Sequence, residues 1–170
     1  MKTDGVLDWP LPEGTAPAGF DASVPFVILH PFSRGAGKSL ARDDIGDFFA
    51  KLAPHRIVLA GRHEDDFACP ANVVNLLNRT TLPELVWLLR RAAFVVSVDS
   101  GPMHIAAALT PRLLSIHTWS DPRKVGPYQP EAWVWKDGVL FRMRDIASPK
   151  DHLPAPGIEE VAAFTRARLA

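Results

Sequence analysis

The chain has 170 residues, a length that suits one domain with a hydrophobic core and is too short for two large ones. Hydrophobic residues make up 47% and charged residues 22% of it, a balance that excludes a disordered or fibrous protein. Lys and Arg number 19, as do Asp and Glu, so no net charge attracts nucleic acid or an anionic membrane surface. Any anion must therefore be bound locally.

Cys69 is the single cysteine, which excludes an internal disulfide and a multi-cysteine metal site. The first residues contain no apolar stretch of signal-peptide length, and no later run reaches the ~18 apolar residues of a membrane-spanning helix. We therefore expect a cytoplasmic protein.

Residues 1–24 are rich in Pro, Gly and Ala and are expected to form a linker or an arm. A single folded domain is predicted over 25–148, and a tail with a final helix over 149–170. β-Branched, nearly continuous apolar runs predict buried strands at 26–30, 56–61, 72–76, 94–99 and 112–118. Helical patterns occupy 42–53, 82–93, 101–109 and 157–170; the second has a capping box of Thr81 and Glu84. The alternation predicts a three-layer, Rossmann-like α/β domain with a parallel sheet.

Ligands bind such sheets at the carboxyl ends of the strands, and the loop after residue 30 contains Gly37-Lys38-Ser39, the end of a P-loop motif. The first glycine of that motif should stand at position 32, which is Phe32 after Pro31. Phenylalanine cannot cheaply adopt glycine geometry, and proline lacks an N–H for a phosphate. A P-loop NTPase or kinase is therefore the least favoured of the functions that we consider.

The same loop places Ser33, Arg34, Lys38 and Ser39 at the ligand edge of the first core strand. Two cations in a loop of small residues suit a pyrophosphate. Alternatively, Arg34 and Lys38 are ordinary solvated charges, the commoner fate of any one basic residue.

A second candidate site follows the strand at 94–99. Asp99 ends the strand, Ser100 is an N-cap type, Gly101 allows close backbone approach, and Pro102 suits a first helical turn. The free N–H groups of such a helix start bind anions, and His104 could donate to the same ligand. The alternatives are a locally satisfied histidine and a carboxylate that caps its own turn.

These residues, with the helix "NRTTLPELVWLL" before them and "SDPRKVGPY" after them, resemble the C-terminal half of glycosyltransferase family 9, the ADP-heptose:lipopolysaccharide heptosyltransferases. The family patterns are G-x-T-x-L-x-E-x-x-x-L, D-[ST]-G-P-M-H-x-A-A-A-L and D-P-x-x-x-G-P-Y. "HPFSRGAGKSL" resembles the first donor-domain loop of the family, and the whole resemblance spans about residues 26–130.

The resemblance implies the C-terminal half of a GT-B fold, an inverting glycosyltransferase without metal or cofactor, and ADP-heptose as donor. Lys38 and His104 would be catalytic, with Lys38 and Ser33 at the donor pyrophosphate. Glu64, with Asp65 and Asp66 as competitors, would meet the ribose. The donor-binding residues would be Ser33, Arg34, Lys38, Ser39, Glu64, Asp99, Ser100, Gly101, Pro102, His104 and Asp121, with Pro122 beside Asp121 in the outer wall and Trp119 as a stacking surface or a core residue.

The general base and the acceptor site of the family belong to the N-terminal half, which has no counterpart before residue 24. The expected partners are therefore a nucleotide sugar, a lipopolysaccharide core acceptor and a separate N-terminal half, and no nucleic acid. A binding module without turnover is the alternative to an enzyme. The start of the chain would be the interdomain linker, and the last helix the one that in GT-B enzymes packs back across the cleft.

Overall fold

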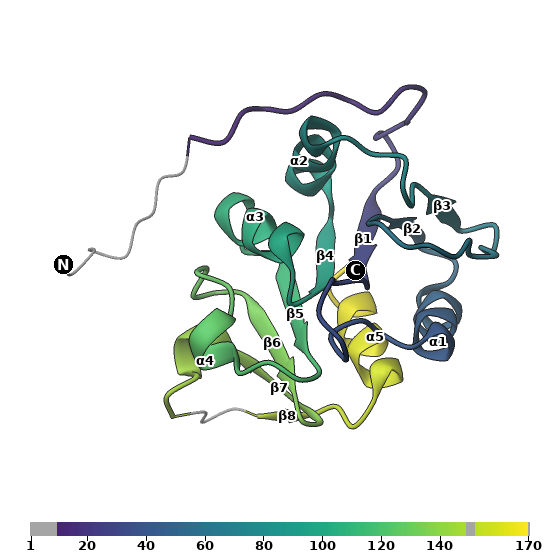
Figure 1. Cartoon of the computed structure of the whole chain (residues 1–170). Coiled ribbons are helices and arrows are strands. Elements are labelled where there is room, and N and C mark those ends of the chain that lie inside the picture. Colours follow the sequence, from purple (N-terminus) through teal and green to yellow (C-terminus); the bar gives the residue numbers. More distant parts are fainter. Residues whose placement is uncertain (1–9, 149–151, 170) are drawn as a thin grey trace.

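The computed structural model describes residues 10–148 and 152–169, and the predicted segments 1–24 and 149–170 extend partly outside these ranges. A single sheet runs through the domain (Figure 1), in the order β3-β2-β1-β4-β5-β6-β7-β8. Its strands are β1 (Phe26–His30), β2 (Arg56–Leu59), β3 (Val73–Asn75), β4 (Phe94–Val98), β5 (Leu113–His117), β6 (Trp133–Lys136), β7 (Val139–Arg142) and β8 (Leu153–Pro154). The five strands expected from the apolar runs are β1 to β5, and each is confirmed.

The sheet is mixed, so the prediction of a parallel sheet is wrong at one edge. β3, β2, β1, β4, β5 and β6 pair in parallel, whereas β7 is antiparallel to β6 and β8 is antiparallel to β7. The cause is a tight hairpin between β6 and β7, where Asp137 and Gly138 both have positive φ angles, of 50° and 80°. Asp-Gly is a preferred pair for such a turn, because its twist matches that of the strands.

The helices are α1 (Arg42–Leu52), α2 (Leu82–Arg91), α3 (Gly101–Leu109), α4 (Pro122–Val125) and α5 (Ile158–Arg166), with a 3-10 turn at Met143–Asp145. All four predicted helices are present, and α4 is additional. The predicted capping box begins α2: the Thr81 hydroxyl accepts from the Glu84 N–H at 3.4 Å, and the Glu84 carboxylate accepts from the Thr81 N–H at 2.7 Å.

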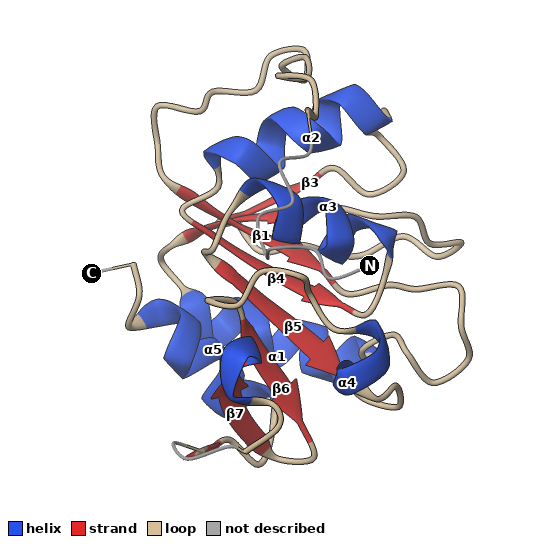
Figure 2. Cartoon of the chain, turned by 90° about the vertical axis from the view of Figure 1, so that its left-hand side faces the viewer, coloured by secondary structure: helices blue, strands red, loops and turns tan. Residues whose placement is uncertain are grey.

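Helices cover both faces of the sheet, as Figure 2 shows, with α2 and α3 on one face and α1 and α5 on the other. Val161 and Ala162 of α5 are buried in the same apolar cluster as Ile45 and Phe48 of α1. The final helix therefore completes the core of this domain by packing beside α1.

The described part of the N-terminal arm packs along α2. The Thr15 N–H donates to the Pro83 carbonyl at 3.1 Å, and Arg90 donates to the Pro12 carbonyl at 3.2 Å. Phe20 meets Trp87 edge to face, with 6.3 Å between ring centroids. These contacts hold residues 10–25 against the domain. None of the helices within the described ranges has the length and apolarity needed to cross a membrane.

The chain changes direction across the sheet between β1 and β4. β1 leads to α1 on one face, whereas its parallel neighbour β4 leads to α3 on the other face. The loops after these strands therefore diverge, which opens a crevice at their carboxyl ends.

Candidate functional site

A cleft of about 910 Å³ lies at this crevice. Loops after β1, β2 and β4 and the first residues of α2 enclose it. Its lining contains most of the residues that the sequence predicts as donor-binding: Ser33, Arg34, Ser39, Glu64, Ser100, Gly101 and Pro102. The other lining residues are His30, Phe32, Gly61, Arg62, His63, Asp65, Thr80, Thr81, Leu82 and Leu85.

The loop after β1 is closed by its own hydrogen bonds. The Ser39 hydroxyl accepts from the Ser33 N–H at 3.0 Å and donates to the Ser33 carbonyl at 3.3 Å. The Lys38 N–H donates to Gly35, and the Thr118 hydroxyl of the loop after β5 donates to the Gly37 carbonyl at 2.6 Å. In a P-loop the helix begins at the Gly-Lys-Ser and its N–H groups face a phosphate. Here α1 begins only at Arg42, so this is not P-loop geometry.

Lys38 and Asp99 form an ion pair, with 2.8 Å between Nζ and Oδ2. The Asp99 side chain is 7% exposed and that of Lys38 is 24% exposed. Burial alone raises the pKa of Asp99, but the hydrogen bond and charge of Lys38, together with the nearby Ser120 hydroxyl, lower the pKa below the usual value of an aspartate. Asp99 is therefore an anion at neutral pH. The pair stands beside the cleft, and Lys38 also lies over the exposed Trp119, with Nζ 5.6 Å from the ring centroid.

Two helix N-termini border the cleft, those of α2 and α3. The sequence predicts only the second. Ser100 is the N-cap of α3, but its hydroxyl makes no capping bond; it lies 3.3 Å from the Ser97 hydroxyl and 3.4 Å from His30 Nδ1. The first backbone N–H groups of α3 therefore receive no side-chain cap, and a ligand anion can meet them.

His30 forms part of the cleft floor and was not predicted, although it ends the first strand. Burial lowers its pKa to about 4, so the ring is neutral at physiological pH. Gly61, which has a φ of +134°, allows the chain to pass close to this ring, since a Cβ there would stand 3.1 Å from Nε2. The floor is thus uncharged.

Asn78 holds the loop after β2 in place. It occupies the glycine position of the G-x-T-x-L pattern and has a φ of 61°, which asparagine tolerates. Its side chain donates to the His63 carbonyl at 2.7 Å and accepts from the His63 N–H at 3.1 Å, and its own N–H donates to Gly61. The two walls of the cleft are therefore joined. The sequence contains one sign of this role, because Asn78 stands where the family pattern has a glycine.

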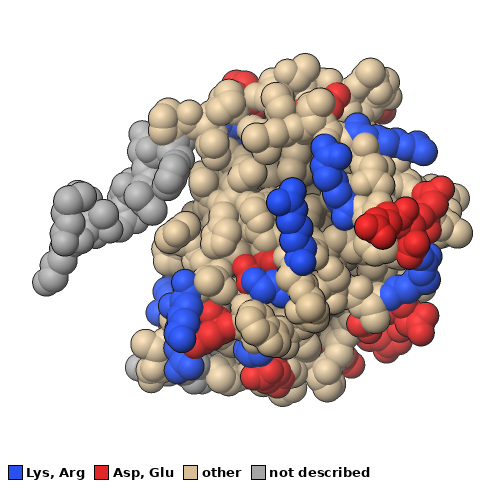
Figure 3. Space-filling model, viewed as in Figure 1, with Lys and Arg blue, Asp and Glu red and all other residues tan. Residues whose placement is uncertain are grey.

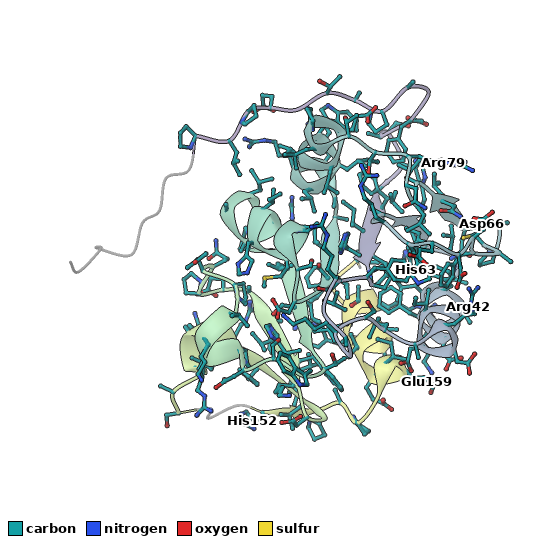
Figure 4. The ribbon with its side chains drawn as sticks, viewed as in Figure 1. Arg42, His63, Asp66, Arg79, His152 and Glu159 are labelled. Atoms are coloured by element: carbon teal, nitrogen blue, oxygen red, sulfur yellow. The ribbon has the colours of Figure 1, made fainter. Side chains whose placement is uncertain are left out.

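Three acidic residues follow in this loop, and the structure separates their roles. Asp65 pairs with Arg42 at 3.3 Å, and the Asp66 side chain accepts from the Phe67 N–H at 3.0 Å. Figure 4 shows Arg42, His63 and Asp66 together on the same side of the molecule. Glu64 is exposed and lines the cleft, so its carboxylate is the one best placed to accept from a ligand.

His104 and Asp121 do not line this cleft. His104 Nδ1 is buried and has no hydrogen-bond partner among the described residues, and its ring packs near Tyr128, with 5.7 Å between centroids. Asp121 caps α4 by accepting from the Arg123 N–H at 3.0 Å, and it pairs with the Arg123 guanidinium. With Trp119 and Pro122 it lines a separate depression of about 340 Å³.

The surface around the cleft carries charges of both signs, as Figure 3 shows. Within residues 10–148 and 152–169, no group of three or more His, Cys, Asp or Glu side chains is placed to hold a metal ion.

Comparison with known proteins identifies relatives. Residues 56–139 match the sequence model of glycosyltransferase family 9 (heptosyltransferase). Lipopolysaccharide heptosyltransferase 1 of Salmonella typhimurium is 37% identical over 76 residues, which are 45% of this chain and 23% of that protein. Lipopolysaccharide heptosyltransferase 3 of Escherichia coli K12 is 25% identical over 159 residues, 85% of this chain and 46% of that protein. The chain thus spans less than half the length of these relatives.

Solved structures share the fold. The structure of E. coli ADP-heptose LPS heptosyltransferase II superposes with a TM-score of 0.68 at 21% identity, over 89% of this chain and 48% of that one. That of E. coli heptosyltransferase WaaC with ADP gives a TM-score of 0.60 at 19% identity, over 86% and 45%. The α/β domain thus corresponds to about half of a GT-B protein, and the chain belongs to glycosyltransferase family 9.

Proposed function

We propose that this chain is the donor-binding half of an inverting, metal-independent heptosyltransferase. It would bind a nucleotide sugar, with ADP-heptose as the first candidate, for transfer to a lipopolysaccharide core acceptor. The observation that carries the proposal is the cleft at the β1–β4 switch point, which is bordered by the uncapped N-terminus of α3. The similar proteins, which include heptosyltransferases and one structure with ADP, support the proposal.

The cleft supplies what a departing nucleoside diphosphate needs. Breaking the glycosyl–phosphate bond moves an electron pair, and so negative charge, onto the diphosphate. Preorganised N–H groups and cations stabilise that charge as it develops. The start of α3 and the guanidinium groups of Arg34 and Arg62 are the groups at this cleft that could do so. Glu64 would accept hydrogen bonds from the ribose hydroxyls.

Lys38 and His104 would assist from the edge of the cleft. The Lys38 ammonium is held by Asp99 but keeps an exposed side, so it can also meet an anionic ligand. The Nδ1 atom of His104 is buried and has no hydrogen-bond partner within the described part of the chain. A buried N–H without an acceptor is costlier than a free lone pair, which favours the tautomer with the proton on Nε2. That N–H would be a donor for a ligand oxygen.

We propose that the acceptor site and the general base lie in a second half, which corresponds to the part of the relatives outside the matched residues. We propose that this half is a separate chain or segment, and that the complex works in the cytoplasm at the inner face of the inner membrane. A nucleotide-sugar-binding module without turnover is the second candidate, because the cleft would bind a nucleotide sugar in either case.

Calorimetry with ADP in the presence of EDTA tests the binding step. We expect binding without metal, weakened about tenfold by Lys38→Met, since hydrogen bonds to charged groups contribute about 1.5–3 kcal/mol. Lys51→Met removes an exposed lysine of α1 that only pairs loosely with Glu159, at 3.9 Å, and serves as the matched control. No ADP binding by the wild-type chain would refute the proposal.

Turnover separates the two candidates. Acceptor-dependent release of ADP from ADP-heptose, by the chain alone or together with an acceptor-binding half, is expected of an enzyme. ADP binding without any such release under both conditions would identify the binding module. Magnesium-dependent hydrolysis of ATP would instead support the NTPase reading of Gly37-Lys38-Ser39.

A further inference from the structure

Trp119, in the loop after β5, is an exposed tryptophan. Its residue is 70% exposed, whereas Trp87, Trp133 and Trp135 are partly buried against the two apolar clusters of the domain. A tryptophan ring is a large apolar surface, and covering it with another apolar surface is favourable. The ring of Trp119 is therefore free to pack against a ligand.

The backbone on both sides of Trp119 is held in place. On one side, the Thr118 hydroxyl donates to the Gly37 carbonyl at 2.6 Å. On the other side, Ser120 is buried, and its hydroxyl lies 3.0 Å from Nδ1 of His117. The exposed ring thus projects from a fixed loop, so little of the loop has to be ordered when a ligand binds.

Trp119 lines the depression of about 340 Å³ that lies apart from the larger cleft. Two ion pairs contribute to the same lining: Asp121 with Arg123 at 3.0 Å, and Lys136 with Asp137 at 3.1 Å. Two carboxylates and two cations leave this lining without net charge. The depression therefore does not favour an anion such as a phosphate.

The combination of an aromatic ring with fixed charges of both signs suits a sugar. A pyranose ring has an apolar C–H face, which an indole can cover, and hydroxyl groups, which both donate and accept hydrogen bonds. Carboxylates accept strongly from hydroxyls, and arginine and lysine donate strongly to them. The volume is near the lower limit of about 300 Å³ for ligand pockets, which fits one small ring.

The position of Lys38 connects this depression with the donor. Lys38 Nζ lies over the Trp119 ring, 5.6 Å from its centroid. In a nucleotide sugar the sugar is bonded directly to the terminal phosphate. A diphosphate at Lys38 would therefore have its sugar within reach of Trp119.

We infer that the depression is a carbohydrate subsite in which the Trp119 indole covers one face of a pyranose ring. The inference rests on the proposed function, which makes the donor sugar the first source of that ring. A sugar of the acceptor is the second source, since it has the same chemistry. The closing experiments distinguish the two.

Calorimetry with ADP-heptose and with ADP tests the donor sugar. Trp119→Ala should weaken ADP-heptose binding about tenfold and leave ADP binding within about threefold of wild type. Trp119→Phe keeps an aromatic ring and should bind ADP-heptose within about threefold of wild type. Val24→Ala removes another exposed apolar side chain, 49% exposed and next to the amino end of β1, and should change neither affinity.

The acceptor sugar is tested with a lipopolysaccharide core oligosaccharide, added to the ADP-saturated chain. A loss confined to oligosaccharide binding in Trp119→Ala would assign the subsite to the acceptor. Unchanged binding of both sugars would overturn the inference. Equal losses of ADP and ADP-heptose affinity would also overturn it, because Trp119 would then act only through Lys38.

Fluorine NMR of the chain labelled with 5-fluorotryptophan gives a direct readout of contact. The Trp119 signal, identified by its absence in Trp119→Phe, should shift further with ADP-heptose than with ADP. Equal shifts with both ligands, with no response to the oligosaccharide, would overturn the subsite while leaving the proposed function intact. A wild type that binds neither ADP nor ADP-heptose would refute the proposed function and, with it, the subsite.

Discussion

Lowering the pH from 7.5 to 5 should destabilise this protein through two buried histidines, His30 and His117. Burial lowers the pKa of each from 6.5 to about 4 in the folded state. Around His117, Asp99 opposes this shift, whereas Lys136, His104 and Lys38 add to it. The unfolded chain takes up both protons near pH 6.5, and the folded chain resists them until about pH 4. The contribution of these two histidines to the free energy of unfolding is therefore complete above about pH 6.5 and is lost as the pH drops toward 4.

The size of the effect follows from these pKa values. At pH 5 each histidine costs about 2 kcal/mol relative to pH 7.5, or about 4 kcal/mol for the two together. A typical domain has a free energy of unfolding of about 5–15 kcal/mol, so this loss is a large part of the total. The paired carboxylates act at lower pH, since the pKa of Asp99 is held below the usual value of an aspartate.

Urea unfolding followed by tryptophan fluorescence measures the effect, because the chain has 5 tryptophans. The free energy of unfolding of the wild type should fall by about 4 kcal/mol between pH 7.5 and pH 5. The double variant His30→Phe/His117→Phe keeps aromatic rings at both positions and should lose most of that dependence, whatever its stability at pH 7.5. A wild type that changes by less than about 1 kcal/mol, or a double variant with an unaltered slope, would refute the reasoning.

Three further outcomes are expected. Thr81→Ala removes the capping box of α2 and should cost about 1 kcal/mol in urea unfolding; no loss would contradict the role of the cap. Gly138→Ala places a side chain at a φ of +80° in the β6–β7 hairpin and should lower the free energy of unfolding, measured in urea, by about 1 kcal/mol; an unchanged value would contradict the need for glycine there. Glu64→Gln should weaken ADP binding several-fold. Asp65→Asn loses only an exposed ion pair with Arg42 and should leave the affinity for ADP within about twofold of wild type. Equal effects of the two substitutions would show that Glu64 does not bind the ligand.

The central strands and the main helices could be predicted from the sequence, because apolar runs and capping residues define them locally. β1 and β4 are buried along their whole length, so their continuous apolar runs are unambiguous. The capping box of Thr81 and Glu84 sets the start of α2, because both partners lie within one turn. The order of the strands does not follow from these patterns, because right-handed crossovers limit the face on which each helix lies and not the neighbour of each strand.

The antiparallel edge of the sheet was harder to predict, because only a two-residue turn in the sequence indicates that a hairpin forms there. Asp137 and Gly138 are the only local sign of the hairpin, and β6 has one fully buried residue, Val134, among half-buried ones. β8 is two residues long and exposed, so no periodicity marks it. Such strands are defined by their neighbours and not by their own composition.

The candidate site, too, depends both on local sequence patterns and on contacts between segments that lie far apart in the chain. The sequence places Lys38 and Asp99 after different strands, 61 residues apart, and each has an ordinary alternative as a solvated or capping charge. What joins them is the parallel pairing of β1 with β4, in which His30 is opposite Ser97. That register brings the loop after β1 to the end of β4, where the buried carboxylate meets the lysine. The Gly-Lys-Ser sequence therefore takes its role from the neighbouring strand: a lysine that a P-loop would aim at a bound phosphate is instead fixed by Asp99 at the edge of the cleft.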